Sequence, residues 1–592
     1  MRVRLVFAMS VVACGNSPSE PEGLPPECRF RSAADDMQAP PNDTPRWAFR
    51  PWISKDISDD ADTRAFVRGF EERGIPVGAV VFDSPWATSY NSMVVNPDRY
   101  PAFDQLVADL HAKNIRSVMW VTQMVNRSSF DLESDGDTYL GPSPNFEEGK
   151  HCGFYVDDNN DYLWWKGNGA GVDFFDPDAV AWWHRQQDKM LDLGIDGWKL
   201  DFGEDYLPES FPTEAGVVTR QEYSEAYYAD YYAYGASRRP EFVTMVRPYD
   251  QSYGRPGRFY ARPEDAPIGW VGDNRRDWIG IADALDHMFR SADAGYVAIG
   301  SDIGGYLDKD DENLLDSGIP FDTLVFARWT ALGALTPFMQ LHGRANITPW
   351  TVPDHVDETV DLYRYWATLH DEMVPWWYST SRTAHAGGPM PMRPIGELAS
   401  WTGDYRYTLG EAFLVAPILD ATGVRDIGLP AGRWYDWWHA GDPAIDGNTT
   451  LTAYAMPERE RMPLFVREGA IVPLHVSSSA TGLGTAARGD ALTVLVWPST
   501  SETSFALVDH DDLPTTITAQ ASSVTLSRVA RTTYIRVRRD AAPTSVQAGS
   551  TLSQVASDDA LDTAATGWRY DAAGRFLWIK LAPGGSVVVT AS

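Results

Sequence analysis

Hydrophobic and polar positions alternate along residues 46–385 in a pattern that predicts a repeated unit of one strand and one helix. Short apolar runs are separated by segments in which apolar residues recur every three or four positions, as in 103–110 and 179–193. The eight apolar runs are 47–53, 78–82, 115–121, 195–200, 242–246, 267–271, 296–300 and 337–341. Strands that alternate with helices in this way indicate a parallel (β/α)8 TIM barrel, an α/β fold.

The pattern changes after about residue 387. Short stretches of alternating apolar and polar residues follow, separated by Gly and Pro turns, for example at 492–497, 504–508, 534–537 and 586–590. This pattern is typical of all-β sandwiches. We therefore predict two β-sandwich domains after the barrel, a proximal one over 386–475 and a distal one over 476–592, with a Ser-, Ala-, Thr- and Gly-rich connection at 476–489.

The first residues have the features of a targeting segment. Arg2 and Arg4 precede an apolar run that is too short to span a bilayer, so residues 1–13 read as a signal peptide. The run ends V-V-A-C-G at 11–15, which resembles the lipobox of bacterial lipoproteins and implies lipidation of Cys14. Plain secretion or a misassigned start codon are the alternatives. The expected location is extracytoplasmic, with a lipid anchor as the only membrane contact.

Residues 14–45 are rich in Pro, Ser, Gly and acidic residues, and we predict that they form a flexible tether. Apart from Cys14, only Cys28 and Cys152 are present. An oxidising compartment would allow these two to form a disulfide, but two free thiols fit the sequence nearly as well.

Charge and composition exclude several classes of partner. Lys and Arg number 50 against 82 Asp and Glu, a net charge of −32, which repels nucleic acid and acidic membrane surfaces.

The chain has no HExxH, GxSxG or P-loop motif, and the acidic stretch at 308–312 departs from a calcium loop at Asn313 and Ile319. No cofactor and no metal are therefore expected. The abundant Trp, Tyr and Phe suit stacking on sugar rings, although most will fill the core. The sequence does not set the oligomeric state.

Most of the apolar runs end in a polar or charged residue. In a parallel barrel these ends meet at the carboxyl-terminal face, where barrel enzymes place their active sites. Any single one of these residues could instead be a helix cap or part of a structural ion pair. Carboxylates gathered in an aromatic-rich mouth suit glycoside cleavage, which uses paired carboxyl groups. The residues are Asp83, Asp201, Arg247, Asp273, Asp302 and His342.

Several segments in this region resemble glycoside hydrolase family 31. G-I-D-G-W-K-L-D-F-G-E at 194–204 resembles the nucleophile segment of that family, in its D-F-G-E form. Order and spacing also agree for four later segments, and the similarity covers roughly residues 46–514. These segments are W-V-G-D-N at 270–274, S-D-I-G-G-Y at 301–306, R-W at 328–329, and M-Q-L-H-G at 339–343 with P-W at 349–350.

The resemblance implies a catalytic pair. Asp201 matches the nucleophile and Asp273 the general acid/base. Arg247 matches an arginine near the nucleophile, with Arg262 as its rival because the segment between Arg247 and Asp273 is expanded. A retaining, double-displacement mechanism follows. It requires a protonated Asp273 with a raised pKa and an ionised Asp201 close to a cation.

The resemblance also implies substrate-binding residues. Asp83, in F-D-S-P-W at 82–86, matches the position that holds sugar hydroxyls, and His342 matches a hydroxyl-binding histidine. Trp86, in the same segment as Asp83, is a further substrate-binding candidate. Asp302 corresponds to a buried supporting carboxylate. The remaining candidates for the wall of the site are Lys199 and Trp270.

The expected function is that of an exo-acting retaining α-glycosidase that removes a terminal neutral sugar from an oligosaccharide or glycoside, an α-xyloside or an α-glucoside. A sulfoquinovosidase or a transglycosylase of the same family, or a non-catalytic glycan-binding lipoprotein on a degenerate barrel, are the alternatives. Family members usually carry a sandwich domain before the barrel, whereas only the tether precedes Trp47 here. The chain is thus expected to be either a reduced member or the product of a truncated gene model.

Overall fold

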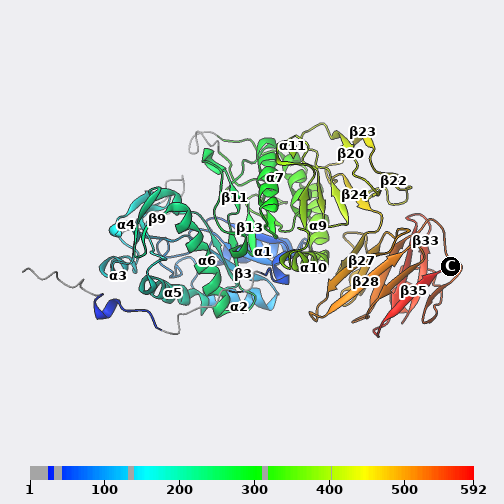
Figure 1. Ribbon diagram of the computed structural model, residues 1–592, viewed down its shortest axis with the longest axis horizontal. Helices are drawn as coiled ribbons and strands as arrows, with labels where there is room; N and C mark the ends of the chain where they lie inside the picture. Colours follow the sequence, from blue (N-terminus) through cyan, green and yellow to red (C-terminus); the bar gives the residue numbers. More distant parts are fainter. Residues whose placement is uncertain are drawn as a thin grey trace, which may run out of the picture.

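The structure, a computed structural model, describes residues 24–32, 40, 43–130, 139, 141–309, 318–401 and 403–592. The predicted signal peptide, Cys14 and most of the acidic stretch that begins at Asp308 lie outside the described residues. A barrel, drawn in blue to green in Figure 1, is followed by two β-rich domains, of which the distal one lies at the far end in orange and red.

Eight parallel strands close the barrel, as the apolar runs predict. The seventh strand is broken at Ser301 into two short pieces, of which the first pairs with β13 and the second with β16, so that the sheet has no free edge. Each of the eight runs contains part of a strand, and the predicted fold class is confirmed. The strands are β1 (Trp52–Lys55), β2 (Ala79–Phe82), β3 (Arg116–Val121), β7 (Gly197–Leu200), β10 (Val243–Val246), β13 (Ile268–Trp270), β14 and β15 (Ile299–Gly300 and Asp302–Ile303), and β16 (Gln340–Leu341).

Helices cover the outside of the barrel after all but one of these strands. Between β10 and β13 the chain, which is described throughout, forms a hairpin of β11 (Tyr249–Asp250) and β12 (Arg258–Phe259) with short 3-10 turns instead of an α-helix. Gly254, Pro256 and Gly257 oppose helix formation there. The strand–helix repeat therefore differs from the prediction in its fifth unit. The barrel helices are α1 (Asp60–Glu71), α2 (Phe103–Ala112), α5 (Pro177–Leu191), α6 (Arg220–Arg238), α7 (Trp278–Asp293), α8 (Thr323–Ala334) and α9 (Val356–Glu372), and α10 (Val374–His385) follows α9.

Two further excursions enlarge the carboxyl-terminal side of the barrel. A three-stranded sheet and two short helices follow β3, and a hairpin follows β7. These additions supply walls around the mouth of the barrel. Their elements are β4 (Met124–Ser129), β5 (Tyr162–Trp164), β6 (Gly167–Gly171), α3 (Phe146–Cys152), α4 (Val156–Asn159), β8 (Ser210–Thr213) and β9 (Gly216–Thr219).

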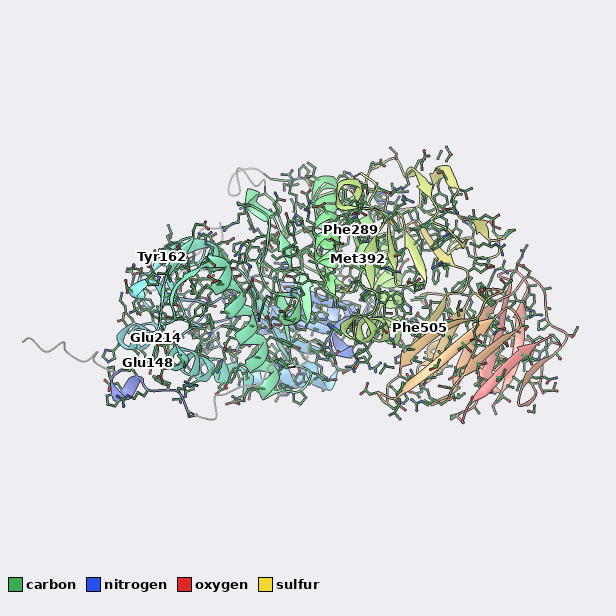
Figure 2. All side chains as sticks on the ribbon, viewed as in Figure 1. Glu148, Tyr162, Glu214, Phe289, Met392 and Phe505 are labelled. Carbon is green, nitrogen blue, oxygen red and sulfur yellow. A yellow bond between two sulfur atoms is a disulfide. The ribbon has the colours of Figure 1, made fainter. Side chains whose placement is uncertain are left out.

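The proximal domain is built on a six-stranded sheet and a two-stranded one. Its core is continuous with that of the barrel: Phe289 of α7 and Met392 of the first proximal strand belong to one buried cluster, and both are labelled in Figure 2. The six strands are β17 (Met392–Pro394), β18 (Tyr407–Leu409), β19 (Phe413–Val415), β24 (Leu464–Arg467), β21 (Arg433–Asp436) and β22 (Ile445–Asp446), and the pair is β20 (Val424–Gly428) with β23 (Thr450–Ala455).

The distal domain is a sandwich of a five-stranded and a six-stranded sheet around its own apolar core. Its first paired strand is β25 (Ile471–Leu474), which pairs with β26 at the junction of the two domains. Ile471 packs in the distal core, whereas Val472 and Leu474 pack in the core shared by the barrel and the proximal domain. The sheets are β25, β26 (Leu492–Val496), β30 (Thr533–Arg538), β34 (Phe576–Leu581) and β33 (Gly567–Asp571), and β27 (Thr503–Val508), β28 (Pro514–Gln520), β29 (Ser523–Leu526), β35 (Val587–Ala591), β31 (Val546–Ala548) and β32 (Ser550–Thr551).

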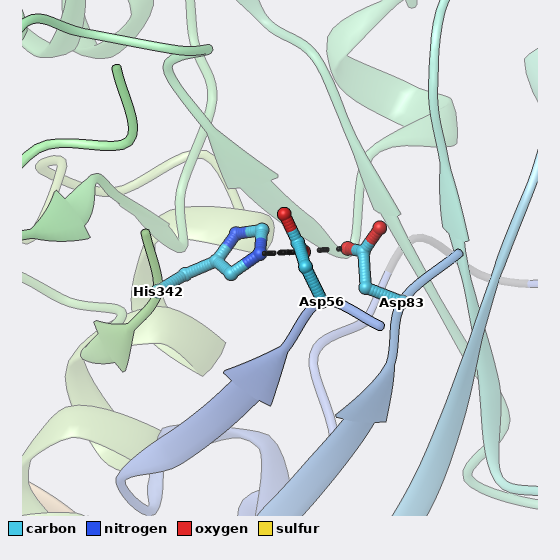
Figure 3. A group of neighbouring side chains, drawn as sticks. All are labelled: Asp56, Asp83 and His342. Atoms are coloured by element: carbon cyan, nitrogen blue, oxygen red, sulfur yellow. Dashed lines mark hydrogen bonds and ion pairs between the residues drawn. The ribbon is translucent and has the colours of Figure 1, made fainter. Parts of the chain in front are cut away.

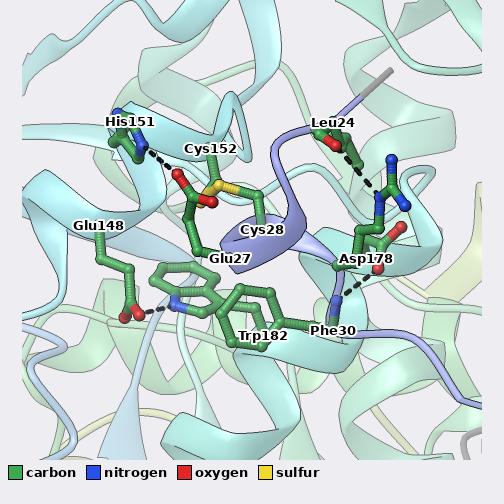
Figure 4. The surroundings of a disulfide bond; sticks show 10 residues. Leu24, Glu27, Cys28, Phe30, Glu148, His151, Cys152, Asp178 and Trp182 are labelled. Atoms are coloured by element: carbon green, nitrogen blue, oxygen red, sulfur yellow. Dashed lines mark hydrogen bonds and ion pairs between the residues drawn. A yellow bond between two sulfur atoms is a disulfide. The ribbon is translucent and has the colours of Figure 1, made fainter.

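Part of the predicted tether is bound to the barrel. Cys28 and Cys152 form a disulfide with their Cα atoms 5.3 Å apart, which settles the pairing that the sequence leaves open. Next to it, Phe30 packs edge-on against Phe154, and its main-chain N–H donates to Asp178 at 2.6 Å (Figure 4). Residues 24–32 are thus a strap held on the barrel and not a free linker. Among the described residues no helix has the length and apolar character needed to cross a membrane.

Candidate active site

The alternation of side chains along the barrel strands directs the candidate residues into the barrel mouth. Trp198 and Leu200 of β7 belong to the outer core that packs under the helices, so Lys199 and Asp201 point inward. Asp83 follows β2 at the same inward parity, since Val81 lies in the interior cluster. The pattern of one strand therefore determines both the core and the site.

Asp273 reaches the mouth by a different route. Trp270 points into the barrel, and strict alternation would turn the side chain of residue 273 outward. Gly272 has φ = +80°, a conformation that favours glycine and redirects the chain at this point. A Cβ at this position would also lie 2.3 Å from a carboxylate oxygen of Asp250, so the glycine in W-V-G-D is required on both grounds.

Arg247 bridges the two candidate catalytic carboxylates. Its Nη2 lies 2.8 Å from Oδ1 of Asp201 and 2.7 Å from Oδ2 of Asp273. Because both oxygens contact one nitrogen, they lie at most about 5.5 Å apart, and a separation of about 5–5.5 Å is typical of retaining glycosidases. Asp201 also accepts the indole N–H of Trp120 at 3.0 Å. The rival Arg262 is half-exposed and pairs with Asp265, away from the site.

The pKa values of the pair differ from the sequence-based expectation. Burial raises the pKa of Asp201, and the charge of Asp273 adds to this effect while Arg247 opposes it. For Asp273, burial is outweighed by the charge and hydrogen bond of Arg247, which hold its pKa below the usual range, with a further contribution from Tyr253. The expectation of a raised pKa for Asp273 is thus wrong for the protein without substrate, because Arg247 bonds directly to the acid/base candidate.

A second charged cluster lies beside the pair. The ammonium group of Lys199 donates to Oδ2 of Asp83 at 2.7 Å and lies 3.2 Å from Nδ1 of His342. Nε2 of His342 lies 2.8 Å from Oδ1 of Asp56, and Figure 3 shows these side chains facing one another at the ends of neighbouring strands. Burial and Lys199 oppose a charged imidazole, but Asp56 and Asp302 outweigh them and raise the pKa of His342 to about 10. His342 is therefore a cation at neutral pH.

The same cluster has the spacing of a metal site but not its chemistry. Ligand atoms of Asp56, Asp83 and His342 all lie within 4.8 Å of one another. A histidine must be neutral to bind a metal, whereas the carboxylates around His342 favour its charged form, and Lys199 already pairs with Asp83. Asp83 and Lys199, which line the neighbouring cavity, instead offer a charged acceptor and a charged donor for the hydroxyl groups of a bound molecule.

A cavity of about 270 Å³ opens over the catalytic pair. Ligand sites typically have volumes of about 300–1,000 Å³, so this smaller cavity suits a small ligand. Five of the predicted residues line it, together with aromatic and basic side chains that the sequence analysis did not identify. The lining consists of Asp83, Ser84, Trp120, Trp165, Lys166, Lys199, Asp201, Phe202, Tyr206, Arg247, Tyr253, Arg255, Asp273 and Tyr306.

The other four predicted residues lie behind the lining. The indole N–H of Trp86 donates to the carbonyl oxygen of Trp120, which places Trp86 in the core. Trp270 is fully buried beneath the cationic groups of Lys199 and Arg247. Asp302 is also fully buried and accepts from Gln340 at 2.6 Å. His342, the fourth, lies behind the lining residues Lys199, Asp83 and Tyr306. None of the four is among the described lining residues, so each supports the site from behind.

The site residues that the sequence analysis missed differ in how far the sequence pattern could have revealed them. Asp56 directly follows β1, as other candidate carboxylates follow their own strands. The first apolar run ends at residue 53, however, so the apolar pattern does not point to Asp56. Trp120 is an inward residue within β3 and looks like core. Tyr253 and Arg255 lie in the hairpin that replaces a helix, where no periodic pattern could predict their direction.

A closed parallel barrel that carries a buried carboxylate pair at its carboxyl-terminal face defines a class, the barrel glycoside hydrolases. Within that class, residues 41–380 match the TIM-barrel domain of glycosyl hydrolases family 31, and residues 389–472 match the C-terminal domain of the same family. The chain belongs to glycoside hydrolase family 31.

The chain is also similar to curated proteins in sequence and to solved structures in fold. An α-xylosidase of Emericella nidulans is 24% identical over 467 residues, 74% of this chain and 55% of its own length, and an α-glucosidase of Saccharolobus solfataricus is 24% identical over 527 residues, 82% of this chain and 68% of its own. The cycloalternan-forming enzyme of Listeria monocytogenes, solved with a pentasaccharide, superposes with a TM-score of 0.77 at 21% identity, over 93% of this chain and 54% of its own. The dextranase of Flavobacterium johnsoniae, solved with glucose, gives 0.74 at 19% identity, over 93% and 71%. The chain spans about half the length of the Emericella and Listeria proteins.

Proposed function

We propose that this protein is a retaining exo-α-glycosidase that hydrolyses terminal α-linked neutral sugars, α-xylosides or α-glucosides. The observation that carries the proposal is the shared contact of Asp201 and Asp273 with one nitrogen of Arg247, which limits their separation to about 5.5 Å. That distance leaves room for direct attack by one carboxylate on a sugar held between them, and not for a water molecule.

In the first step, a carboxylate oxygen of Asp201 attacks the anomeric carbon while Asp273 protonates the departing glycosidic oxygen. The product is a glycosyl ester of Asp201. Water then attacks the same carbon from the side of Asp273, which takes its proton and releases Asp201. Arg247 stabilises the negative charge of whichever aspartate is ionised at each stage.

In the second step Asp273 acts as a base, which its lowered pKa favours. In the first step it acts as an acid, which requires bound substrate to raise this pKa. A bound sugar displaces water from the cavity, and the resulting desolvation favours the neutral form of Asp273. Formation of the ester removes the charge of Asp201, which lowers the pKa of Asp273 again and prepares it to act as a base. The two steps therefore call for opposite shifts, which the site supplies through the charge of one partner.

The lining of the cavity supports recognition of one neutral sugar ring. Asp83 and Lys199 present an acceptor and a donor at the cavity surface, which is the pairing that sugar hydroxyls use. Trp120 and Trp165 add flat apolar surface, with their ring centroids 6.4 Å apart. The support for both xylosides and glucosides comes from relatives that carry each name.

A panel of aryl α-glycosides tests the proposal. Release of the aryl group from an α-xyloside or α-glucoside, with a product of α configuration in proton NMR, is the expected result. Asp201→Ala should lose at least about a thousand-fold in kcat, whereas Asp273→Ala should retain activity on substrates with good leaving groups. Hydrolysis of a sulfoquinovoside alone, sugar transfer to an acceptor in place of hydrolysis, or glycan binding without any turnover would each replace the proposal with a different function.

The proposal extends to location. We place the protein outside the cytoplasm, anchored through a lipid on Cys14. The disulfide between Cys28 and Cys152 supports an oxidising compartment, since disulfides are rare in reducing ones. Cys14→Ser should move the protein from the membrane fraction to a soluble extracytoplasmic fraction, and an unchanged membrane fraction would contradict the anchor.

A further inference from the structure

Tyr253 holds the acid/base candidate from a part of the chain that departs from the barrel repeat. It lies in the short 3-10 turn Ser252–Gly254 of the hairpin between β10 and β13, with φ = +61°, a left-handed conformation that non-glycine residues seldom adopt. Its hydroxyl donates to Oδ2 of Asp273 at 2.9 Å, and its side chain lines the cavity. Left-handed residues of this kind gather at functional sites.

The rest of the turn fastens the main chain of Asp273. The hydroxyl oxygen of Ser252 accepts the main-chain N–H of Asp273 at 2.9 Å, while the Ser252 hydroxyl donates to Asp250 at 2.6 Å. Asp250 in turn lies against Gly272, and its other oxygen accepts from Arg247. One short segment therefore holds both the backbone and the carboxylate of Asp273, and Tyr253 is the member of it that reaches the reacting group.

Arg247 and Tyr253 donate to the same oxygen of Asp273. Nη2 of Arg247 lies 2.7 Å from Oδ2, and the hydroxyl of Tyr253 lies 2.9 Å from it. An oxygen that accepts two hydrogen bonds, one of them from a cation, is the poorer of the two carboxylate oxygens at taking up a proton.

We propose that Tyr253 is a positioning residue that keeps Oδ2 of Asp273 as an acceptor, so that the exchangeable proton of this carboxyl is carried by Oδ1. The inference rests on the proposed function only for its consequence in catalysis. In the first step, the O–H bond at Oδ1 breaks, its proton joins the glycosidic oxygen, and that oxygen keeps the electron pair of the bond to the anomeric carbon. In the second step, Oδ1 takes a proton from the attacking water.

Several charged groups act on Asp273 besides Tyr253. The direction of the hydroxyl's effect follows from its chemistry, because a donor to a carboxylate favours its ionised form. Loss of the hydroxyl should raise the pH at which Asp273 gives up its proton, with the other groups unchanged. The charged groups that act on it directly are Arg247, Lys199 and Asp201. Asp250 pairs with Arg247, and Arg255 and Lys166 line the same cavity.

The test compares Tyr253→Phe with Tyr249→Phe. The first removes the hydroxyl and keeps the ring; the second is a matched control in the same hairpin, where the Tyr249 hydroxyl lies 3.5 Å from Gln251. Carbodiimide reacts with protonated carboxyl groups, so labelling of Asp273, read by peptide mass spectrometry across pH, reports its protonation without any substrate. We expect the labelling midpoint to rise by about 0.5–1 pH unit in Tyr253→Phe and to stay unchanged in Tyr249→Phe.

Activity supplies the second measurement. On an aryl α-glycoside, the alkaline limb of the kcat profile, which reports the substrate complex, should move to higher pH in Tyr253→Phe. An unchanged labelling midpoint in this variant would overturn the inference, whatever the activity. A wild-type protein that cleaves no glycoside while its Tyr253→Phe variant shows the labelling shift would instead overturn the proposed function and leave the hydrogen bond to Asp273 established.

Discussion

The indole Nε1 of Trp120 donates to Oδ2 of Asp201 at 3.0 Å. This hydrogen bond joins an inward residue of β3 to the first residue after the neighbouring strand β7. The other oxygen of Asp201 accepts from Arg247 and from the main-chain N–H of Phe202. Asp201 is thus held on both oxygens by donors that favour its ionised form, against a burial that opposes it.

Trp120→Phe should therefore weaken the nucleophile. A hydrogen bond to a charged group contributes about 1.5–3 kcal/mol, so its loss should lower kcat/KM by roughly 10- to 100-fold. The pKa of Asp201 should rise, and the acidic limb of the kcat profile, which reports the substrate complex, should move to higher pH. Steady-state kinetics across pH measure both effects. A drop in activity with an unmoved acidic limb, or a lowered melting temperature that explains the loss, would show that the indole acts on the structure and not on Asp201.

Arg258 supports the segment that follows the nucleophile. It donates to Glu204 at 2.9 Å and to Asp205 at 3.0 Å, and Glu204 is fully buried. Glu204 keeps donors in Gln123 and Ser224 when Arg258 is removed. Leaving a buried carboxylate without its cation is strongly destabilising, but these remaining donors reduce the cost.

Arg258→Met should accordingly lower the free energy of unfolding by about 2–3 kcal/mol, less than the 3–5 kcal/mol of a wholly unpaired charge. Urea denaturation measures the change. Adding Glu204→Gln to the variant should restore part of the loss, because the neutral amide no longer needs the cation. A double variant that is less stable by the full sum of the two single losses would contradict a direct interaction.

The fold could be predicted from the sequence because the barrel imposes one simple rule on each strand. Lys199 and Asp201 alternate with Trp198 and Leu200, so the direction of the site residues follows from the apolar pattern. The rule fails where the chain leaves the strand, as it does at Tyr253, which is placed by a turn with positive φ.

The electrostatics of the site could not be read from the sequence either. Whether Asp201 or Asp273 has the higher pKa depends on which oxygens Arg247 touches, and a spacing of residues along the chain does not set that contact. Whether a side chain lies in the cavity lining or behind it could not be read from the sequence either. Trp86 lies in the same loop after β2 as the lining residue Asp83, yet its indole turns toward the carbonyl oxygen of Trp120 and into the core.

The disulfide between Cys28 and Cys152 should stabilise the protein measurably. It joins residues 124 positions apart and fixes the strap that carries Phe30 against the barrel. Constraint of the unfolded chain by such a link typically contributes about 2–4 kcal/mol. Replacing both cysteines with serine should lower the free energy of unfolding by this amount, measured by denaturation without reductant. The wild-type protein in reductant should lose the same stability, and a variant as stable as the oxidised wild type would contradict the assignment.

Glu372 links stability to pH far from the active site. It is the last residue of α9 and fully buried; its Oε2 accepts from Thr481 at 2.7 Å, while its Oε1 has no hydrogen-bond partner among the described residues. Burial raises the pKa of Glu372 to about 8. The folded state therefore holds a proton that the unfolded state releases above its ordinary value of 4.5.

Because the folded state binds more protons in that interval, the free energy of unfolding should fall as pH rises from about 4.5 to about 8, by up to about 1.4 kcal/mol per pH unit. Glu372→Gln keeps the neutral form at every pH and should remove this part of the slope. Thermal melting of both proteins between pH 5 and 8, at constant ionic strength, measures the difference. Asp361→Asn, an exposed position on the same helix that pairs with Arg364, is the control and should leave the slope unchanged. Parallel slopes for the wild type and Glu372→Gln would show that the Glu372 carboxyl is not held neutral by its burial.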